Sequence, residues 1–313
     1  MPTDGAGRRP DVAAVLAAAG RIAPYVHRTP VLTSGSIDVL VGVPVHFKCE
    51  PFQRSGSFKL RGALAAVTAN LDEARHRGVV THSSGNHGAA LALAGRLLQV
   101  AATVVVPAGA SEFKRAAVVR YGARLVDCGP TLEDREAALA EVQAESGALF
   151  VPPYDHAEVI AGQGTATLEL LEAVPEIGSI WVPVGGGGLA AGAVLVGADA
   201  GVRVCAGEPE LADDAYRSLA SGERQPAPPP RTVADGLRTA LGELNFAILR
   251  DYGLPVVRVA EQEIRDAQRI VWNRLKVVAE PSAVVPLAAL LKHGTDAPAG
   301  VILSGGNVDL PTL

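Results

Sequence analysis

This chain is poor in cysteine and in aromatic residues. Its three cysteines, Cys49, Cys128 and Cys205, are far apart and odd in number, which argues against a disulfide framework and leaves no CxxC pair for zinc. Aromatic side chains make up only 4% of the residues, so few are available to stack on the bases of single-stranded nucleic acid. The cysteine pattern suits a reducing compartment, and we therefore expect a cytoplasmic protein.

The chain also lacks an excess of positive charge and a long apolar run. With 28 basic and 33 acidic residues its net charge is −5, and no cluster of lysine and arginine is suited to DNA or RNA. The most apolar stretch, residues 189–198, is too short to span a bilayer, and the first ten residues lack the apolar core of a signal peptide. We expect no nucleic-acid partner, no secretion and no membrane insertion.

The 313 residues exceed one typical hydrophobic core, so two lobes, or one large domain with an insertion, are expected. After an opening helix and two short strands, strand and helix patterns alternate along most of the chain. This alternation favours βαβ units and parallel sheets, with ligand-binding groups in the loops after the strands. The predicted strands are residues 31–32, 45–49, 79–82, 102–107, 124–128, 149–152, 179–184, 202–207, 255–260 and 301–303. The main predicted helices are residues 10–20, 89–98, 112–121, 132–145, 157–173, 189–198, 261–276 and 281–291, and another begins at Lys59.

The stretch SGSFKLRG, residues 55–62, places a lysine in the first turn of that helix. Ser55 or Ser57 is the predicted N-cap, and the apolar residues that follow have the spacing of an amphipathic helix. Because a helix N-terminus carries partial positive charge, the ammonium form of Lys59 is disfavoured there. The neutral amine that Schiff-base chemistry needs becomes more accessible, although a solvated surface position is the ordinary role of a lysine.

Four consecutive glycines lie between a predicted buried strand and a helix: Gly185, Gly186, Gly187 and Gly188. Their backbone N–H groups can converge at the helix start, which predicts a phosphate cradle, whereas a tight turn needs only one or two glycines. The same run with Ala190 and Glu208 imitates a dinucleotide fingerprint and would indicate an NAD(P)-binding dehydrogenase. We favour the cradle because that fingerprint usually opens a nucleotide-binding domain.

Two further loops carry polar groups. Residues 83–88, SSGNHG, place hydroxyls, an amide and spare N–H groups at a helix start, where they could bind a carboxylate or simply cap the helix. Residues 304–307, SGGN, repeat a hydroxyl at the end of the last strand. The hydrolase pattern GxSxG and the nucleotide-binding loop GxxxxGK[ST] are both missing, and His82 and His87 are wrongly spaced for a zinc pair on one helical face.

Taken in order, SGSFKLRG, SSGNHG, the four glycines and SGGNVDL closely resemble the fold-type II pyridoxal-phosphate enzymes. The most similar group comprises serine racemase, serine/threonine dehydratase and 3-hydroxyaspartate dehydratase, and the resemblance covers nearly the whole chain. It implies an α/β fold like that of tryptophan synthase β, with two lobes, each a mostly parallel sheet flanked by helices. We assign residues 1–66 and 157–313 to a large cofactor-binding domain and 67–156 to a small mobile domain. A homodimer is also implied.

By this resemblance Lys59 forms the Schiff base with pyridoxal 5′-phosphate, Phe58 packs beside the cofactor and Asn86 lies near its ring hydroxyl. The four glycines would bind the phosphate, and Ser304 would meet the pyridine nitrogen. A hydroxyl there, unlike a carboxylate, does not enforce a protonated ring. The electron sink is therefore milder, which favours rapid elimination or reprotonation.

The resemblance implies two catalytic groups, Lys59 and Ser84, on opposite faces of the substrate. Lys59 would take the α-proton, and a second acid or base at Ser84 would permit racemisation, unless its hydroxyl only caps the helix. Tyr154 replaces an asparagine of the racemase group and favours elimination. The implied substrate-binding residues are Ser83, Ser84, Asn86, His87, Arg135 and Thr239.

Arg135 matches a position that meets a second carboxylate in the racemase group, so a dicarboxylic hydroxy amino acid is a possible substrate. A solvated ion pair is the ordinary role of such an arginine. The segment 208–214 resembles the divalent-cation site of that group. Glu208 and Asp214, with the carbonyl of Ala212, would supply hard oxygen ligands for Mg²⁺, Ca²⁺ or Mn²⁺, whereas an acidic helix start is the alternative.

We therefore expect a pyridoxal-phosphate lyase that removes water from L-serine, L-threonine or 3-hydroxyaspartate and gives a 2-oxo acid and ammonia. An amino-acid racemase with side dehydratase activity is the alternative. An NAD(P)-binding protein and a catalytically silent ligand sensor are the remoter ones.

Overall fold

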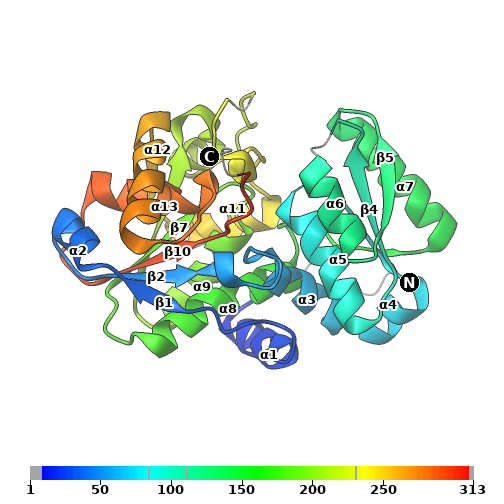
Figure 1. Cartoon of the computed structure of the whole chain (residues 1–313), viewed down its shortest axis with the longest axis horizontal. Helices are drawn as coiled ribbons and strands as arrows, with labels where there is room; N and C mark the ends of the chain where they lie inside the picture. The colour runs from blue at the N-terminus through cyan, green and yellow to red at the C-terminus, as the bar shows by residue number, and fades with distance from the viewer. Residues whose placement is uncertain (1–8, 84, 110–111, 230, 310–313) are drawn as a thin grey trace.

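Two β-sheets organise the chain, as seen in the computed structural model, which describes residues 9–83, 85–109, 112–229 and 231–309 (Figure 1). The larger sheet has six strands in the order β1-β2-β10-β7-β8-β9, and the smaller has four in the order β5-β4-β3-β6. All neighbouring strands are parallel except β1, which is antiparallel to β2. The strands are β1 (Val31–Thr33), β2 (Val45–Cys49), β3 (Val79–His82), β4 (Ala102–Pro107), β5 (Arg124–Cys128), β6 (Leu149–Phe150), β7 (Ser179–Pro183), β8 (Arg203–Pro209), β9 (Val256–Val259) and β10 (Ala299–Leu303).

Helices cover both faces of each sheet, as buried parallel strands require. Figure 1 shows the larger sheet in one lobe, the smaller sheet in the other, and α3 between them. The α-helices are α1 (Val12–Ile22), α2 (Gly35–Val41), α3 (Lys59–Ala69), α4 (Leu71–Arg77), α5 (Asn86–Leu98), α6 (Glu112–Arg120), α7 (Leu132–Ser146), α8 (Ala157–Ala173), α9 (Gly188–Asp199), α10 (Asp214–Ser221), α11 (Glu243–Asp251), α12 (Glu261–Ile270) and α13 (Pro281–His293).

The central strands are apolar on both sides because each face is covered. On the larger sheet, Trp181 and Val301 pack with α12 and α13, whereas their neighbours Ile180 and Ile302 pack in the core formed with α9 and α11. A third core joins α1, α3, α5 and α8. This third core anchors α3, which begins with Lys59, against helices of both lobes.

The expected fold class, two lobes with mostly parallel sheets, is confirmed, and most predicted elements lie within one or two residues of their expected bounds. The predicted strand 149–152 ends at Phe150, because the prolines at 152 and 153 have no N–H to continue the ladder. The predicted helix 261–276 breaks after Ile270 into a π-helical turn, Val271–Leu275. Three short helices, α2, α10 and α11, were not predicted, and the helix that was expected to run from Lys59 to about residues 75–78 is divided at Asn70 into α3 and α4. Among the described residues, no helix combines the length and the apolarity that a bilayer crossing requires.

Candidate active site

Lys59 is the first residue of α3, as predicted, and the turn before it is bound to the end of β10. The Phe58 N–H donates to the Ser304 carbonyl (3.0 Å), and the Asn307 side chain donates from Nδ2 to the Ser55 carbonyl (2.8 Å). The last strand of the large sheet therefore fixes where the lysine side chain starts.

The predicted N-cap was wrong. Phe58 occupies the cap, and no side chain accepts a hydrogen bond there. Ser57 instead pairs as an isolated bridge with Gly305 and lies one residue before the N-cap, and its buried hydroxyl has no hydrogen-bond partner among the described residues. The Ser55 hydroxyl donates to the Ser57 carbonyl (3.2 Å). The backbone pairing of Ser57 with Gly305 therefore keeps Ser57 from capping the helix.

The amine of Lys59 is half-buried between aromatic rings. Its Nζ lies 5.1 Å from the centroid of the Phe58 ring and 6.0 Å from that of Tyr154, and donates to the Pro153 carbonyl (2.7 Å). Burial lowers the pKa of Lys59 to about 8, although the charge of the nearby Glu280 carboxylate opposes this shift. Near pH 8 a large fraction of Lys59 is therefore the neutral amine that a nucleophile or base must be. Desolvation, rather than the helix dipole, is the main cause.

The four glycines form a buried turn between β7 and α9. Gly187 has φ +93°, a backbone conformation that favours glycine, and a Cβ on Gly186 would lie 2.4 Å from Cγ of Tyr154. The N–H groups of Gly186, Gly187 and Gly188 make no hydrogen bond to another described residue. Free N–H groups at the start of a 12-residue helix, with no room for side chains, fit the phosphate of the expected cofactor.

Asn86 is the first residue of α5 and joins the two lobes. Its Nδ2 donates to both oxygens of Glu280, at 2.9 and 3.1 Å, and its Oδ1 accepts from Nδ2 of Asn307 (2.9 Å). Sequence reasoning did not assign Glu280 or Asn307 to the site. Asn307 belongs to the recognised motif that begins at Ser304, and Glu280, the N-cap of α13, lies in the segment 280–282 that shares the family resemblance, but neither was given a role.

The loop after β3 carries the expected carboxylate-binding groups. Ser83 is half-buried, and its hydroxyl accepts from the Gly85 N–H (3.3 Å), whereas Ser84 lies outside the described residues. His87 is buried, and its Nε2 contacts the Val151 carbonyl (3.0 Å). Burial, helped by the charge of Lys59, lowers the pKa of His87 to about 3. The imidazole is neutral and donates to Val151, so it offers a carboxylate no positive charge.

Two expected substrate residues lie farther from these contacts. Arg135 is half-buried on α7 and donates from Nε to the Thr131 carbonyl (3.3 Å). Burial and then the charge of Arg135 lower the pKa of His82, which stacks on Phe150 with ring centroids 5.5 Å apart. Thr239 is exposed and takes no part in the hydrogen bonds that join the other described site residues.

The expected cation ligands lie at the end of β8 and the start of α10. Glu208 is buried, and its oxygens accept the N–H groups of Ala215 (2.9 Å) and Tyr216 (2.8 Å), while Asp214 accepts the Leu241 N–H (2.8 Å). Burial raises the pKa of both carboxyls. In the described ranges, no three histidine, cysteine or acidic side chains gather as a metal site would require. Both Glu208 oxygens already accept backbone N–H groups, which disfavours the ribose contact that the dinucleotide interpretation needs.

Ala212 follows Glu208 within the short 3₁₀ turn Glu210–Ala212 and is buried.

Known proteins resemble this chain over nearly its full length. Residues 22–305 match the family model described as pyridoxal-phosphate dependent enzyme. A serine racemase of Oryza sativa subsp. indica is 44% identical over 98% of this chain and 94% of its own. The β-hydroxyaspartate dehydratase of Paracoccus denitrificans is 43% identical over 96% of each. The structure of maize serine racemase matches with a TM-score of 0.94 at 44% identity, covering 97% of this chain and 95% of that one.

Proposed function

The chain belongs to the pyridoxal-phosphate-dependent enzymes, and from this premise we propose that it racemises serine or a similar hydroxy amino acid. Serine racemases predominate among its highly similar curated relatives, which supports this alternative better than the dehydration that the sequence led us to expect. These relatives carry the choice of racemisation, and the position of Tyr154 supports the cofactor chemistry that racemisation and dehydration share. The Tyr154 ring lies near both the Lys59 amine and the glycine cradle, so one bound group can reach both.

The residues at this place fit the cofactor. We assign the glycine N–H groups to its phosphate, Lys59 to its covalent attachment, Phe58 to packing beside its ring, Asn86 to its ring hydroxyl and Ser304 to its pyridine nitrogen. When bound, pyridoxal phosphate withdraws electrons from the α-carbon of an attached amino acid and so makes loss of the α-proton feasible.

The protein's own part is binding and proton transfer. With a pKa of about 8, much of the Lys59 amine is neutral near pH 8, where it can accept the α-proton and return it. Backbone N–H groups and the Ser83 hydroxyl at the start of α5 would bind the substrate carboxylate. Racemisation also needs a proton donor on the opposite face, and we assign that role to Ser84.

Dehydration is the second candidate function. Tyr154 favours it, and the relatives that act as β-hydroxyaspartate dehydratase and L-threo-3-hydroxyaspartate ammonia-lyase are as similar to this chain as several racemases. Arg135 would then bind a second carboxylate of the substrate through its planar fork.

One experiment separates the two functions. The purified holoenzyme is given L-serine, L-threonine or L-threo-3-hydroxyaspartate in D₂O, and chiral chromatography and 2-oxo acid assays follow the products. We expect D-serine, with deuterium at the α-carbon of both enantiomers. A 2-oxo acid without any D-amino acid would refute racemisation and leave dehydration. Turnover by Lys59→Ala at a rate near wild type would refute the site itself.

We also propose a divalent cation at Glu208, Asp214 and the Ala212 carbonyl, a homodimer, and closure of the small domain, residues 67–156, over the substrate. Burial raises the pKa of both carboxyls, and the charge of Asp214 adds to the rise at Glu208. This supports the cation, because Mg²⁺ or Ca²⁺ would neutralise the two carboxylates. We expect chelation to lower both turnover and melting temperature, and unchanged values would refute the cation.

Sedimentation of the holoenzyme as a monomer would refute the dimer.

A further inference from the structure

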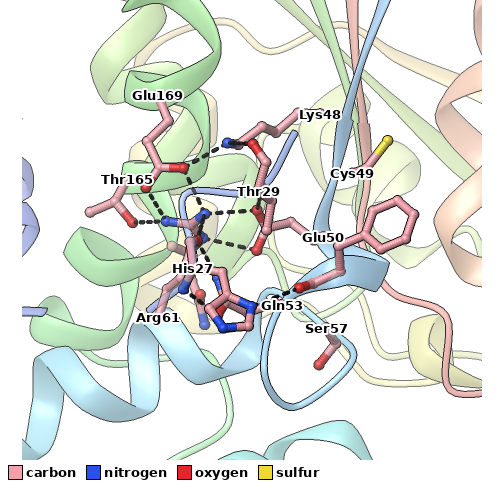
Figure 2. A network of polar contacts seen from close by, with 12 residues as sticks. His27, Thr29, Lys48, Cys49, Glu50, Gln53, Ser57, Arg61, Thr165 and Glu169 are labelled. Atoms are coloured by element: carbon pink, nitrogen blue, oxygen red, sulfur yellow. Dashed lines mark hydrogen bonds and ion pairs between the residues drawn. The ribbon is translucent and has the colours of Figure 1, made fainter. Parts of the chain in front are cut away.

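An arginine is fully buried two residues after Lys59, in the same turn of α3. Each of its five N–H groups has an acceptor, and Figure 2 shows the side chains of Arg61, Glu50, Glu169 and Thr165 that take part. Nε and Nη2 donate to the two oxygens of Glu50, both at 2.8 Å, and Nη1 and Nη2 donate to Glu169 at 2.7 and 2.9 Å. The remaining Nη1 hydrogen reaches Oγ1 of Thr165 at 3.2 Å. The guanidinium therefore joins α3 to the 3₁₀ turn Glu50–Phe52 and to α8.

Two cations and two carboxylates balance within this group. Lys48 is 1% exposed and donates to Glu169 (2.6 Å) and to the Thr29 carbonyl (2.8 Å), and the Thr29 hydroxyl donates to Glu50 (2.6 Å). Burial alone would raise the pKa of Glu169, but the charges of Arg61 and Lys48 outweigh it and lower that pKa. Burial lowers the pKa of Lys48, and the charge of Glu169 opposes that shift. The Arg61 network, defined as Arg61, Glu50, Glu169, Lys48, Thr29 and Thr165, thus sets two basic side chains against two acidic ones.

Helix preference does not explain Arg61. A cation in the first turn opposes the helix dipole, and a buried ion pair is often no more stabilising than apolar residues of the same volume. What the network provides is geometry, because two bidentate carboxylates define the plane of the guanidinium. A second contact acts on the same turn, since Oε1 of Gln163 on α8 accepts the Gly62 N–H (3.2 Å).

We propose that Arg61 is a positioning residue, which with Glu50 and Glu169 fixes the turn of α3 from which the Lys59 side chain extends. The inference rests on the proposed function, because the position of this turn matters for activity only if Lys59 carries the cofactor and moves the α-proton. The polar contacts of the Arg61 side chain with described residues are all within the Arg61 network and with His27, so its effect on Lys59 would pass through the backbone of α3.

Two glutamates on α8 supply a matched pair of variants. Glu169→Gln weakens the contact with Arg61. Glu172→Gln instead removes an ion pair with Arg28 (2.8 Å), in which the Glu172 side chain is 48% exposed and which does not involve α3. In Glu169→Gln and Arg61→Lys holoenzymes we expect kcat to fall roughly 10- to 100-fold, because a misplacement of about 1 Å can cost that much. KM should stay within about twofold, and Glu172→Gln should match wild type.

The second measurement needs no bound cofactor. The stripped proteins are labelled with limiting acetic anhydride across a pH series, and peptide mapping follows the modification of Lys59. In wild type the midpoint should lie near pH 8. In Glu169→Gln and Arg61→Lys it should move upward, because a loosened turn lets water reach the amine. A purely stabilising role would lower the melting temperature and leave this midpoint in place.

The proposal requires both the fall in kcat and the upward shift of the Lys59 labelling midpoint in the same variant. Wild-type kcat, or an unmoved Lys59 midpoint, in the folded Glu169→Gln protein overturns the proposal. If Arg61→Lys does not fold, Glu169→Gln and the milder Thr165→Val, which removes one neutral hydrogen bond, decide the matter. Failure of the proposed function would look different, since Lys59→Ala would then retain turnover.

Discussion

The glycine cradle makes a sharp prediction, which concerns Gly186→Ala. This glycine has an ordinary φ, so alanine brings no backbone strain, and the added methyl is the whole perturbation. The new Cβ would lie 2.4, 2.5 and 2.7 Å from Cγ, Cδ1 and Cδ2 of Tyr154. Contacts this short require the ring or the glycine turn to shift.

Overpacking of this kind costs about 1–3 kcal/mol. If the shift falls on the cradle, it weakens binding of pyridoxal phosphate by the same amount, and at 1.4 kcal/mol per tenfold the Kd rises by about 5- to 140-fold. The control is Gly20→Ala, because its Cβ meets nothing within 4 Å and lies in α1, where alanine stabilises by about 0.5–1 kcal/mol.

The assay is a titration of pyridoxal phosphate into the stripped protein, followed by absorbance and checked by equilibrium dialysis. The double variant Gly186→Ala/Tyr154→Ala tests the cause, because removing the ring should return most of the affinity. Wild-type affinity in Gly186→Ala, at an unchanged melting temperature, would refute the assignment of this turn to the phosphate.

Three further predictions follow from the same contacts. Between about pH 8 and pH 10.5 the unfolded chain binds more protons at Lys59 than the folded chain does, so the free energy of unfolding of the stripped protein should rise with pH. Lys59→Met should lack this rise, and urea midpoints that change with pH equally in the two proteins would contradict the prediction. Asn86→Asp places a carboxylate where Nδ2 lies 2.9 Å from Glu280, and should cost about 1–3 kcal/mol at pH 7, with partial recovery near pH 5 in urea unfolding. Gly56→Ala adds left-handed strain of about 1–2 kcal/mol and a contact of 2.2 Å with Asn307, so it should lower the melting temperature more than Gly42→Ala, where only the strain applies.

Local patterns carried much of the fold. The alternation of strands and helices was readable because buried parallel strands are short apolar runs and their helices have a distinct spacing. The lysine at a helix start and the glycines after a buried strand were readable for the same reason, since each motif lies within about eight neighbouring residues. Short helices such as α10 and α11 carry too few residues for that periodicity, and they were missed.

Other features depended on residues far apart in the chain. Ser57 was a reasonable cap by local chemistry, but its pairing with Gly305 removed it from the helix. Arg61 carried no expectation from its neighbours in sequence, and its burial and pairing come from Glu50 and Glu169, which are far from it along the chain. Glu280 entered the site only because α13 begins beside Asn86.

The order of motifs along the chain therefore established which chemical groups this protein has, and roughly where its strands and helices lie. The tertiary structure decided how strongly each group holds its charge: burial lowers the pKa of Lys59 to about 8, while Arg61 keeps its charge because two distant carboxylates share its site. Desolvation and charge pairing depend on what surrounds a group in space, and neighbours in sequence supply only a small part of those surroundings.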